Sequence, residues 1–305
     1  MKKNFDFVGF RKISLIISIT LFVLCVVLSL VMGVEMDISF KGGTLAKYSY
    51  TGTLSEDDVT DFVESKLGKN DVVVDLTTSG DKTIISISKT DVLSPEAQED
   101  LTAALQEKYP DNKIVSEQVN AVQPSMGRSF FAKCMLAVAL AALFLILYIA
   151  YRFRKIGGFS AGLMAVFALV NDLAFAYLAF IIFQIPLNDN FVAVMLTILG
   201  YSLNDTIVIF DRIRENRAKM SKEPIDTVVN LSLNQSLGRA ISTSLSTVVA
   251  MACVAVVAAV MNLDSIISFA IPMLFGLVSG SYTSLFLCPP AWSLWMEKKA
   301  KKGKK

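Results

Sequence analysis

Six long apolar runs dominate the sequence, and a polar block, residues 35–123, separates the first run from the second. Each run is close to or above the roughly 20 residues that an α-helix needs to cross the hydrocarbon core of a membrane. The pattern therefore predicts a polytopic α-helical membrane protein with six transmembrane helices and one inserted domain. The runs are residues 13–34, 130–151, 157–183, 191–210, 239–261 and 266–292.

The first run follows the basic residues Arg11 and Lys12, which is also a feature of secretory signals. The run is long enough to span a membrane, and no Ala-x-Ala-like cleavage site follows it. We therefore expect it to be a retained transmembrane helix rather than a cleaved leader.

The polar block 35–123 alternates between strand-like and helix-like patterns. Ser94 followed by Pro95 is typical of a helix start. The order strand, helix, strand, strand, helix, strand is that of the ferredoxin-like, or split βαβ, arrangement, and it predicts an α+β domain. The expected strands are 36–50, 71–78, 82–89 and 113–122, and the expected helices are 55–67 and 94–109.

Basic residues divide the connectors between the runs into two groups. Lys and Arg are abundant after the second run, after the fourth run and in the tail, but absent from residues 184–190 and 262–265. Because Lys and Arg accumulate on the cytoplasmic side, both termini are predicted to be cytoplasmic and the polar domain extracytoplasmic. The predicted division is a cytoplasmic N-terminus 1–12, transmembrane helix 13–34, extracytoplasmic domain 35–123, a bundle of helices 2–6 at 124–298 and a basic cytoplasmic tail 299–305.

One connector has a pattern of its own. Residues 224–237, between the fourth and fifth runs, have apolar positions at helical spacing. The spacing predicts a short amphipathic helix on the cytoplasmic membrane surface.

The composition agrees with that of a membrane protein and argues against several classes of function. The 305 residues are 53% hydrophobic, with a mean hydropathy of +0.54, and only 18% are charged, against about 25% in soluble domains. The sequence has no Walker-type loop, no histidine and no metal-spaced cysteine cluster. We therefore predict no enzymatic activity, no cofactor or metal, no nucleic-acid partner and no ATP hydrolysis. Proton chemistry near neutral pH would have to use carboxylates.

Asp205 is the first candidate for such chemistry, because it lies within the apolar run 191–210. A carboxylate at the centre of a membrane helix costs about 2.5–3.5 kcal/mol on insertion scales. Such a residue is retained when it faces a partner or a wet cavity, which suggests a titrating group in a proton path. The alternative is a fixed ion pair that locks two helices. Asn204 and Thr206 are expected to supply hydrogen bonds around it.

Arg239 and Asp172 are the next candidates. Arg239 begins the fifth run, where an arginine can simply mark the cytoplasmic end of a helix by reaching to the interface. Asp172, in the third run, is either a secondary proton site or a helix-packing group. The spacing Gly276-x-x-x-Gly280 in the sixth run predicts close helix packing.

The stretch 200–216, GYSLNDTIVIFDRIREN, resembles the fourth-helix motif of the SecD/SecF family, in the smaller of its two paired subunits. Residues 40–44, Phe-Lys-Gly-Gly-Thr, resemble the family motif that follows the first helix. The resemblance covers nearly all of the chain. The chain departs from the usual pattern at Ser39, Asn171, Ala240 and Gln123, where the family commonly has Asp, His, Thr and Gly.

The resemblance implies one half of a transporter of the resistance-nodulation-division type in a bacterial inner membrane. It implies a SecD-like subunit as the other half, the SecYEG translocon as the larger assembly, YajC as a further candidate partner and translocating polypeptides as substrates. The implied function is to use the proton-motive force in late steps of polypeptide translocation and release. In this family an arginine at the place of Arg239 is coupled to the aspartate at the place of Asp205. The hypothesis is that Arg239 stabilises ionised Asp205 when close and releases it when the helices separate.

Two other functions remain open. A proton-driven exporter of small molecules or lipids would use the same membrane chemistry, although it normally has larger external domains. A structural assembly factor would not need a buried Asp205.

Overall fold

The computed structural model describes residues 5–68, 72–79, 82–261 and 263–302, so the outermost parts of the predicted terminal segments 1–12 and 299–305, and residue 71 of a predicted strand, lie outside the described residues. Within them, six helical segments are long and apolar enough to cross a membrane. This confirms the prediction of a polytopic helical protein. The segments are α1 (Arg11–Met32), α5 (Pro124–Arg152), α6 (Gly158–Ile182), α7 (Asp189–Lys219), α8 (Ile225–Val260) and the combined α9–η3–α10 (Asp264–Tyr282, Thr283–Leu287, Cys288–Lys302).

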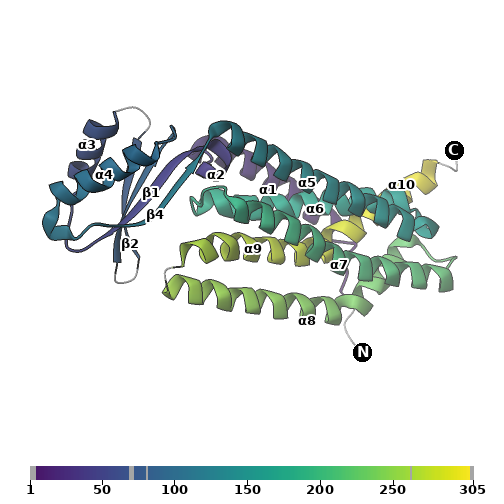
Figure 1. Cartoon of the computed structure of the whole chain (residues 1–305). Coiled ribbons are helices and arrows are strands. Elements are labelled where there is room, and N and C mark those ends of the chain that lie inside the picture. Colours follow the sequence, from purple (N-terminus) through teal and green to yellow (C-terminus); the bar gives the residue numbers. More distant parts are fainter. Residues whose placement is uncertain (1–4, 69–71, 80–81, 262, 303–305) are drawn as a thin grey trace.

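The helices run side by side, and the sheet lies beyond one end of the bundle (Figure 1). Helix α10 and the start of α8 lie at the opposite end. Helices α6, α7 and α9 pack against one another, α8 packs against α9 and α7, and α1 and α5 pack against α6. The apolar windows of α1, α5 and α8 contain few buried residues.

The fifth span differs from its prediction. The expected surface helix 224–237 and the expected span 239–261 form one continuous helix, α8, which begins directly after Pro224. The residue between the two predicted segments is Gly238, which has poor helix propensity. A glycine inside a helix nevertheless costs only about 1 kcal/mol relative to alanine. Nothing else between the two segments interrupts the helix.

The sheet unit has the predicted order of strands and helices. Its four strands lie in the order β2-β3-β1-β4, and all neighbours are antiparallel. Tyr48 and Ile85, paired across β1 and β3, are fully buried in the core between the sheet and its two helices. Burial raises the pKa of Tyr48, although its hydrogen bond with Thr102 acts in the opposite direction. The elements are β1 (Gly43–Tyr50), α3 (Glu56–Leu67), β2 (Val72–Ser79), β3 (Lys82–Lys89), α4 (Pro95–Lys108), η1 (Pro110–Asn112) and β4 (Val115–Val122).

The first strand is shorter than predicted, because residues Ile38–Lys41 form a helical turn, α2. Asp37 explains the turn: its carboxylate accepts hydrogen bonds from the backbone N–H of Ser39 (2.9 Å) and from the Ser39 hydroxyl (2.7 Å). An acid at this position satisfies an N–H group that the helix leaves unpaired. The turn packs against the start of α5 and so joins the sheet to the bundle.

Gly42 is required at this junction. Its φ of +82° is favourable only for glycine, and an added Cβ would overlap the backbone of Pro124, the first residue of α5. Gly33, at the end of α1, has nearly the same backbone angles, but an added Cβ there meets nothing within 4 Å.

The first prediction follows from this matched pair. Both Gly42→Ala and Gly33→Ala introduce backbone strain of about 1–3 kcal/mol, but only Gly42→Ala also forces α2 and α5 apart. We expect Gly42→Ala to lower the melting temperature of the detergent-purified protein more than Gly33→Ala does. Equal shifts would mean that the contact with Pro124 does not constrain the junction.

Candidate functional site

Asp205 lies in the middle of α7 and is 7% exposed. Its carboxylate accepts hydrogen bonds from two hydroxyl groups of α8, Ser244 (3.1 Å) and Thr243 (3.4 Å). Thr243 has one hydroxyl proton, and the carbonyl oxygen of Arg239 lies nearer to it, at 2.9 Å. Ser244 is therefore the stronger of the two donors. Within the described residues, Asp205 is held to α8 by these two hydrogen bonds, at 3.1 and 3.4 Å.

Arg239 lies one turn before Thr243 on α8. In the part of the chain that the structure describes, no ion pair joins its guanidinium group to Asp205. The Arg239 side chain instead lines a surface hollow of about 450 Å³ between α7 and α8, together with Asp211, Arg212 and Glu215. Arg239 and Asp205 therefore lie on neighbouring helices, α8 and α7, but their side chains form no ion pair within the described residues.

Asp172 is completely buried on α6, and its carboxylate accepts hydrogen bonds from three hydroxyl groups on three different elements. The donors are Ser202 of α7 at 2.6 Å, Ser279 of α9 at 2.6 Å and Thr283 of η3 at 2.9 Å from both oxygens. A buried carboxylate without such donors would be strongly destabilising. The hydrogen bonds to Asp172 therefore join α6 to α7, α9 and η3.

Two glycines let the donors reach Asp172. An added Cβ at Gly276 would overlap the Ile198 side chain, and one at Gly280 would lie 3.3 Å from the Cβ of Ser202. The predicted close packing by these glycines therefore occurs between α9 and α7. The sequence pattern indicated the packing but not the hydroxyl groups that it delivers.

The segment η3 is a π-helical interruption between α9 and α10. Its cause is local: Pro289 and Pro290 have no N–H groups, so they cannot donate the hydrogen bonds that a regular α-helix needs. The wider turn contributes Thr283 and the adjacent Ser284 to the buried polar contacts. Interruptions of this kind are frequent at functional sites.

Asn204 and Thr206 do not hydrogen-bond to Asp205 as expected. Thr206 is buried and shares a hydrogen bond with Ser284 of η3 at 3.1 Å. The Asn204 side chain is exposed and has no hydrogen bond within the described residues. The reason is geometric, since neighbouring residues of an α-helix point about 100° apart. Of the three, Asp205 is the one that hydrogen-bonds to α8 within the described residues.

Taken together, these contacts define a polytopic membrane protein with two buried carboxylates, Asp172 on α6 and Asp205 on α7. The class is further specified by the match of residues 101–298 to the family model "Protein export membrane protein SecD/SecF, C-terminal".

The full-length relatives agree. The chain is 32% identical to the protein translocase subunit SecF of Alicyclobacillus acidocaldarius, over 99% of this chain and 96% of that protein. It is 31% identical to the protein translocase subunit SecDF of Bacillus subtilis, over 98% of this chain but 39% of that protein. The chain belongs to the SecD/SecF family and is a SecF-like protein-export subunit.

The fold has a solved counterpart. The crystal structure of SecDF from Thermus thermophilus superposes with a TM-score of 0.81 at 24% sequence identity, over 97% of this chain. The chain spans 39% of the length of that SecDF chain.

The second prediction concerns the fastening at Asp172. Ser279→Ala removes a 2.6 Å hydrogen bond to the carboxylate, and such a loss costs about 1–3 kcal/mol. Ser281→Ala, two residues away, removes only a hydrogen bond to the Leu277 carbonyl of its own helix. Thermal unfolding in one detergent should show a clear loss of stability for Ser279→Ala and little for Ser281→Ala. The reverse order would contradict the role given to Asp172.

Proposed function

We propose that this chain is one half of a proton-driven machine that promotes late steps of polypeptide translocation, with Asp205 as its titrating group. The observation that carries the proposal is a carboxylate buried within a membrane helix, held by two hydroxyl groups and not paired with a cation within the described residues. An acid in this situation is a functional candidate by default. Family membership supports the same role.

The proposed orientation places the sheet unit outside and both termini in the cytoplasm. Arg152 at the end of α5 pairs with Asp211 of α7 at 2.9 Å, so the basic ends of these helices lie together. Arg11 at the start of α1 pairs with Asp226 at the start of α8. These helix ends lie away from the sheet (Figure 1). The positive-inside rule then favours a cytoplasmic position for that end, in a bacterial inner membrane. The sheet unit, whose strand order fits the ferredoxin-like arrangement, would be the extracytoplasmic domain 35–123.

A second six-helix unit is proposed to cover the face of α7 and α8 near Asp205. Small and polar residues lie exposed there, at the depth where a membrane protein normally presents large apolar side chains to lipid. Interfaces between membrane helices favour small and hydroxyl-bearing residues. The residues concerned are Thr197, Gly200 and Asn204 of α7, and Ser242 and Ser246 of α8.

The proposed occupant of this face is a SecD-like subunit. The larger SecDF relatives, of which this chain spans 39%, have the length for such a second half. Assembly with SecYEG and YajC, and action on translocating polypeptides, are extended to this chain from the family resemblance.

The proposed mechanism starts with protonation of Asp205. Hydrogen bonds to a charged group contribute about 1.5–3 kcal/mol each, and those between neutral groups about 0.5–1.5. Protonation therefore weakens the attachment of α8 to α7 by an amount comparable to the roughly 2.3 kcal/mol that one charge gains across 100 mV. Arg239 would stabilise the ionised form when α8 approaches. Asp172 has a secondary place in this pathway, since it holds α7 in position against α6 and α9.

The third prediction tests the titrating group. Asp205→Asn keeps the shape and an acceptor oxygen but cannot change its charge. With the partner subunit and translocon reconstituted in vesicles, we expect it to lose the increase in export that an imposed proton gradient produces. The control is Asp211→Asn, which alters an ion-paired acid on the same helix and should retain the increase. Full proton-linked export by Asp205→Asn would refute the proposal.

The fourth prediction tests the partner surface. Thr197→Trp places a large side chain on the exposed small-residue face of α7, and we expect less SecD-like subunit to co-purify from native membranes. Leu140→Trp also introduces a tryptophan, at an apolar residue of α5 that is 43% exposed. It should leave the amount of co-purified SecD-like subunit unchanged. Equal recovery with both variants would place the partner elsewhere.

A further inference from the structure

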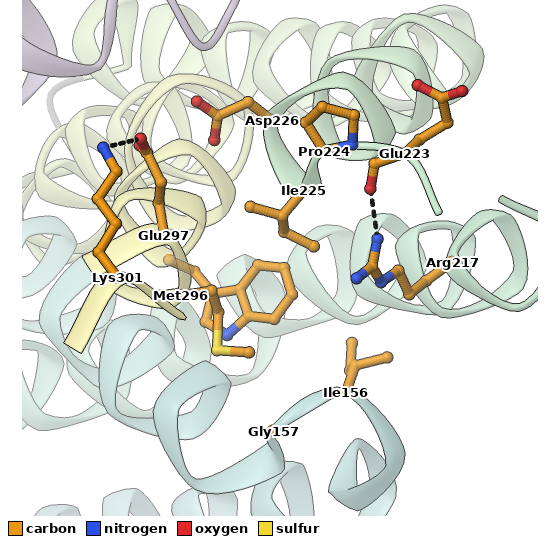
Figure 2. A pocket seen from close by; sticks show the side chains of 11 residues that line it. Ile156, Gly157, Arg217, Glu223, Pro224, Ile225, Asp226, Met296, Glu297 and Lys301 are labelled. Carbon is orange, nitrogen blue, oxygen red and sulfur yellow. Dashed lines mark hydrogen bonds and ion pairs between the residues drawn. The ribbon is translucent and has the colours of Figure 1, made fainter. Parts of the chain in front are cut away.

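Helix α10 has charged residues on two faces, and those on its first face are paired. Arg11 bonds Asp226 at 2.8 Å and Glu297 at 3.3 Å, and Lys301 also bonds Glu297, at 2.7 Å. Figure 2 shows this face, where Arg217 also donates to the Glu223 carbonyl. A hollow of about 600 Å³ lies beside this face, and the two cations in its lining, Arg217 and Lys301, each already have an oxygen partner.

The second face of α10 has two cations without such partners. Lys298 and Lys299 are exposed, and neither forms an ion pair with any residue that the structure describes. Both border a hollow of about 540 Å³. Its walls are otherwise apolar and come from α1, α6 and α10, namely Leu15, Met164, Ala291, Leu294 and Trp295.

The surroundings of this hollow are apolar too. Ile16, next to Leu15 on α1, is 63% exposed, and Leu163, next to Met164 on α6, is 40% exposed. Trp295 is itself 38% exposed one turn before the lysines. Exposed tryptophan below lysine at a helix end is typical of the membrane–water interface, where the indole ring lies at headgroup level.

We propose that this groove binds an anionic phospholipid. The phosphate and the acidic headgroup lie against Lys298 and Lys299, and an acyl chain lies along the apolar walls beside Trp295. Basic pockets between transmembrane helices bind acidic headgroups in this way. The apolar walls argue for a lipid and against a free phosphate ion. The inference needs only the membrane location of α10, so it does not depend on proton coupling at Asp205.

The test compares dioleoyl phosphatidylglycerol with dioleoyl phosphatidylcholine, which differ in headgroup charge but have the same chains. Binding to the full chain is measured by native mass spectrometry after purification in a non-ionic detergent. The double variant Lys298→Gln, Lys299→Gln should bind phosphatidylglycerol about 30-fold more weakly, with phosphatidylcholine binding unchanged. Lys301→Gln, which removes a paired lysine on the same helix, should change phosphatidylglycerol binding by less than about 3-fold.

Further measurements separate the possible ligands. Trp295→Ala should weaken both lipids, because it removes part of the apolar wall. Soluble glycerol phosphate should not compete with phosphatidylglycerol, and effective competition would identify a free-anion site instead. Equal binding of the two lipids by the wild-type chain, or an equal loss with Lys301→Gln, would overturn the proposal. Matching melting temperatures of the variants without added lipid exclude misfolding as the cause.

Discussion

The hydrogen bonds to Asp172 are the constraint on which the bundle depends. In a membrane, apolar side chains gain little by leaving lipid for one another, so helix association relies on close packing and polar contacts. Three hydroxyl groups on α7, α9 and η3 converge on one carboxylate of α6 at 2.6–2.9 Å. A hydrogen bond contributes about 0.5–1.5 kcal/mol between neutral groups and about 1.5–3 kcal/mol when one group is charged, so the three together hold these helices as one block.

The remaining helices are attached differently. In the apolar windows of α6 and α7, 61% and 50% of residues are buried, whereas the corresponding windows of α1, α5 and α8 have 11%, 6% and 11%. Helices α1 and α5 also carry the sheet, because α1 precedes the turn at Gly42 and α5 follows β4. The sheet unit is thus joined to the outer helices. The segment before β1 also contacts the central block, because the Asp37 N–H donates to the Leu187 carbonyl at 3.0 Å and Phe40 packs with Phe180 and Phe191.

The sequence predicted what depends on local pattern. Hydrophobic run length gave the six helices, and period and turn residues gave the order of strands. Asp205 stood out because a single charge in an apolar run is visible without a structure. The continuity of α8 was missed because the change from amphipathic to fully apolar composition at Gly238 looks like a boundary. The turn at Asp37 was missed because one side chain sets it.

The network around Asp172 could not be predicted from the sequence. Its donors lie 30, 107 and 111 residues away, and serine and threonine in membrane helices usually bond to their own backbone, as Ser281 does. One signal was present. The pair Gly276 and Gly280 marked the side of α9 that approaches α7, and Ser279 lies beside Gly280. A close approach of α9 to α7 also brings hydroxyl groups near the glycines into reach of buried polar groups, and Ser279 is the hydroxyl-bearing residue next to Gly280.

The two carboxylates differ in a way that bears on which of them can respond to a proton. Asp172 has three donors and no exposed surface, so a change in its charge would leave several groups of the central block without proper partners. Asp205 has one good donor and one shared donor, both on the weakly buried helix α8, and is 7% exposed. A change in its charge alters contacts with one helix only. On the proposal that Asp205 titrates, a driving energy of about 2.3 kcal/mol per charge at 100 mV is comparable to the loss of one or two hydrogen bonds at Asp205 and smaller than the loss of all three at Asp172. In the proposed mechanism, the helices joined at Asp172 would therefore form the fixed frame against which α8 moves when Asp205 is protonated.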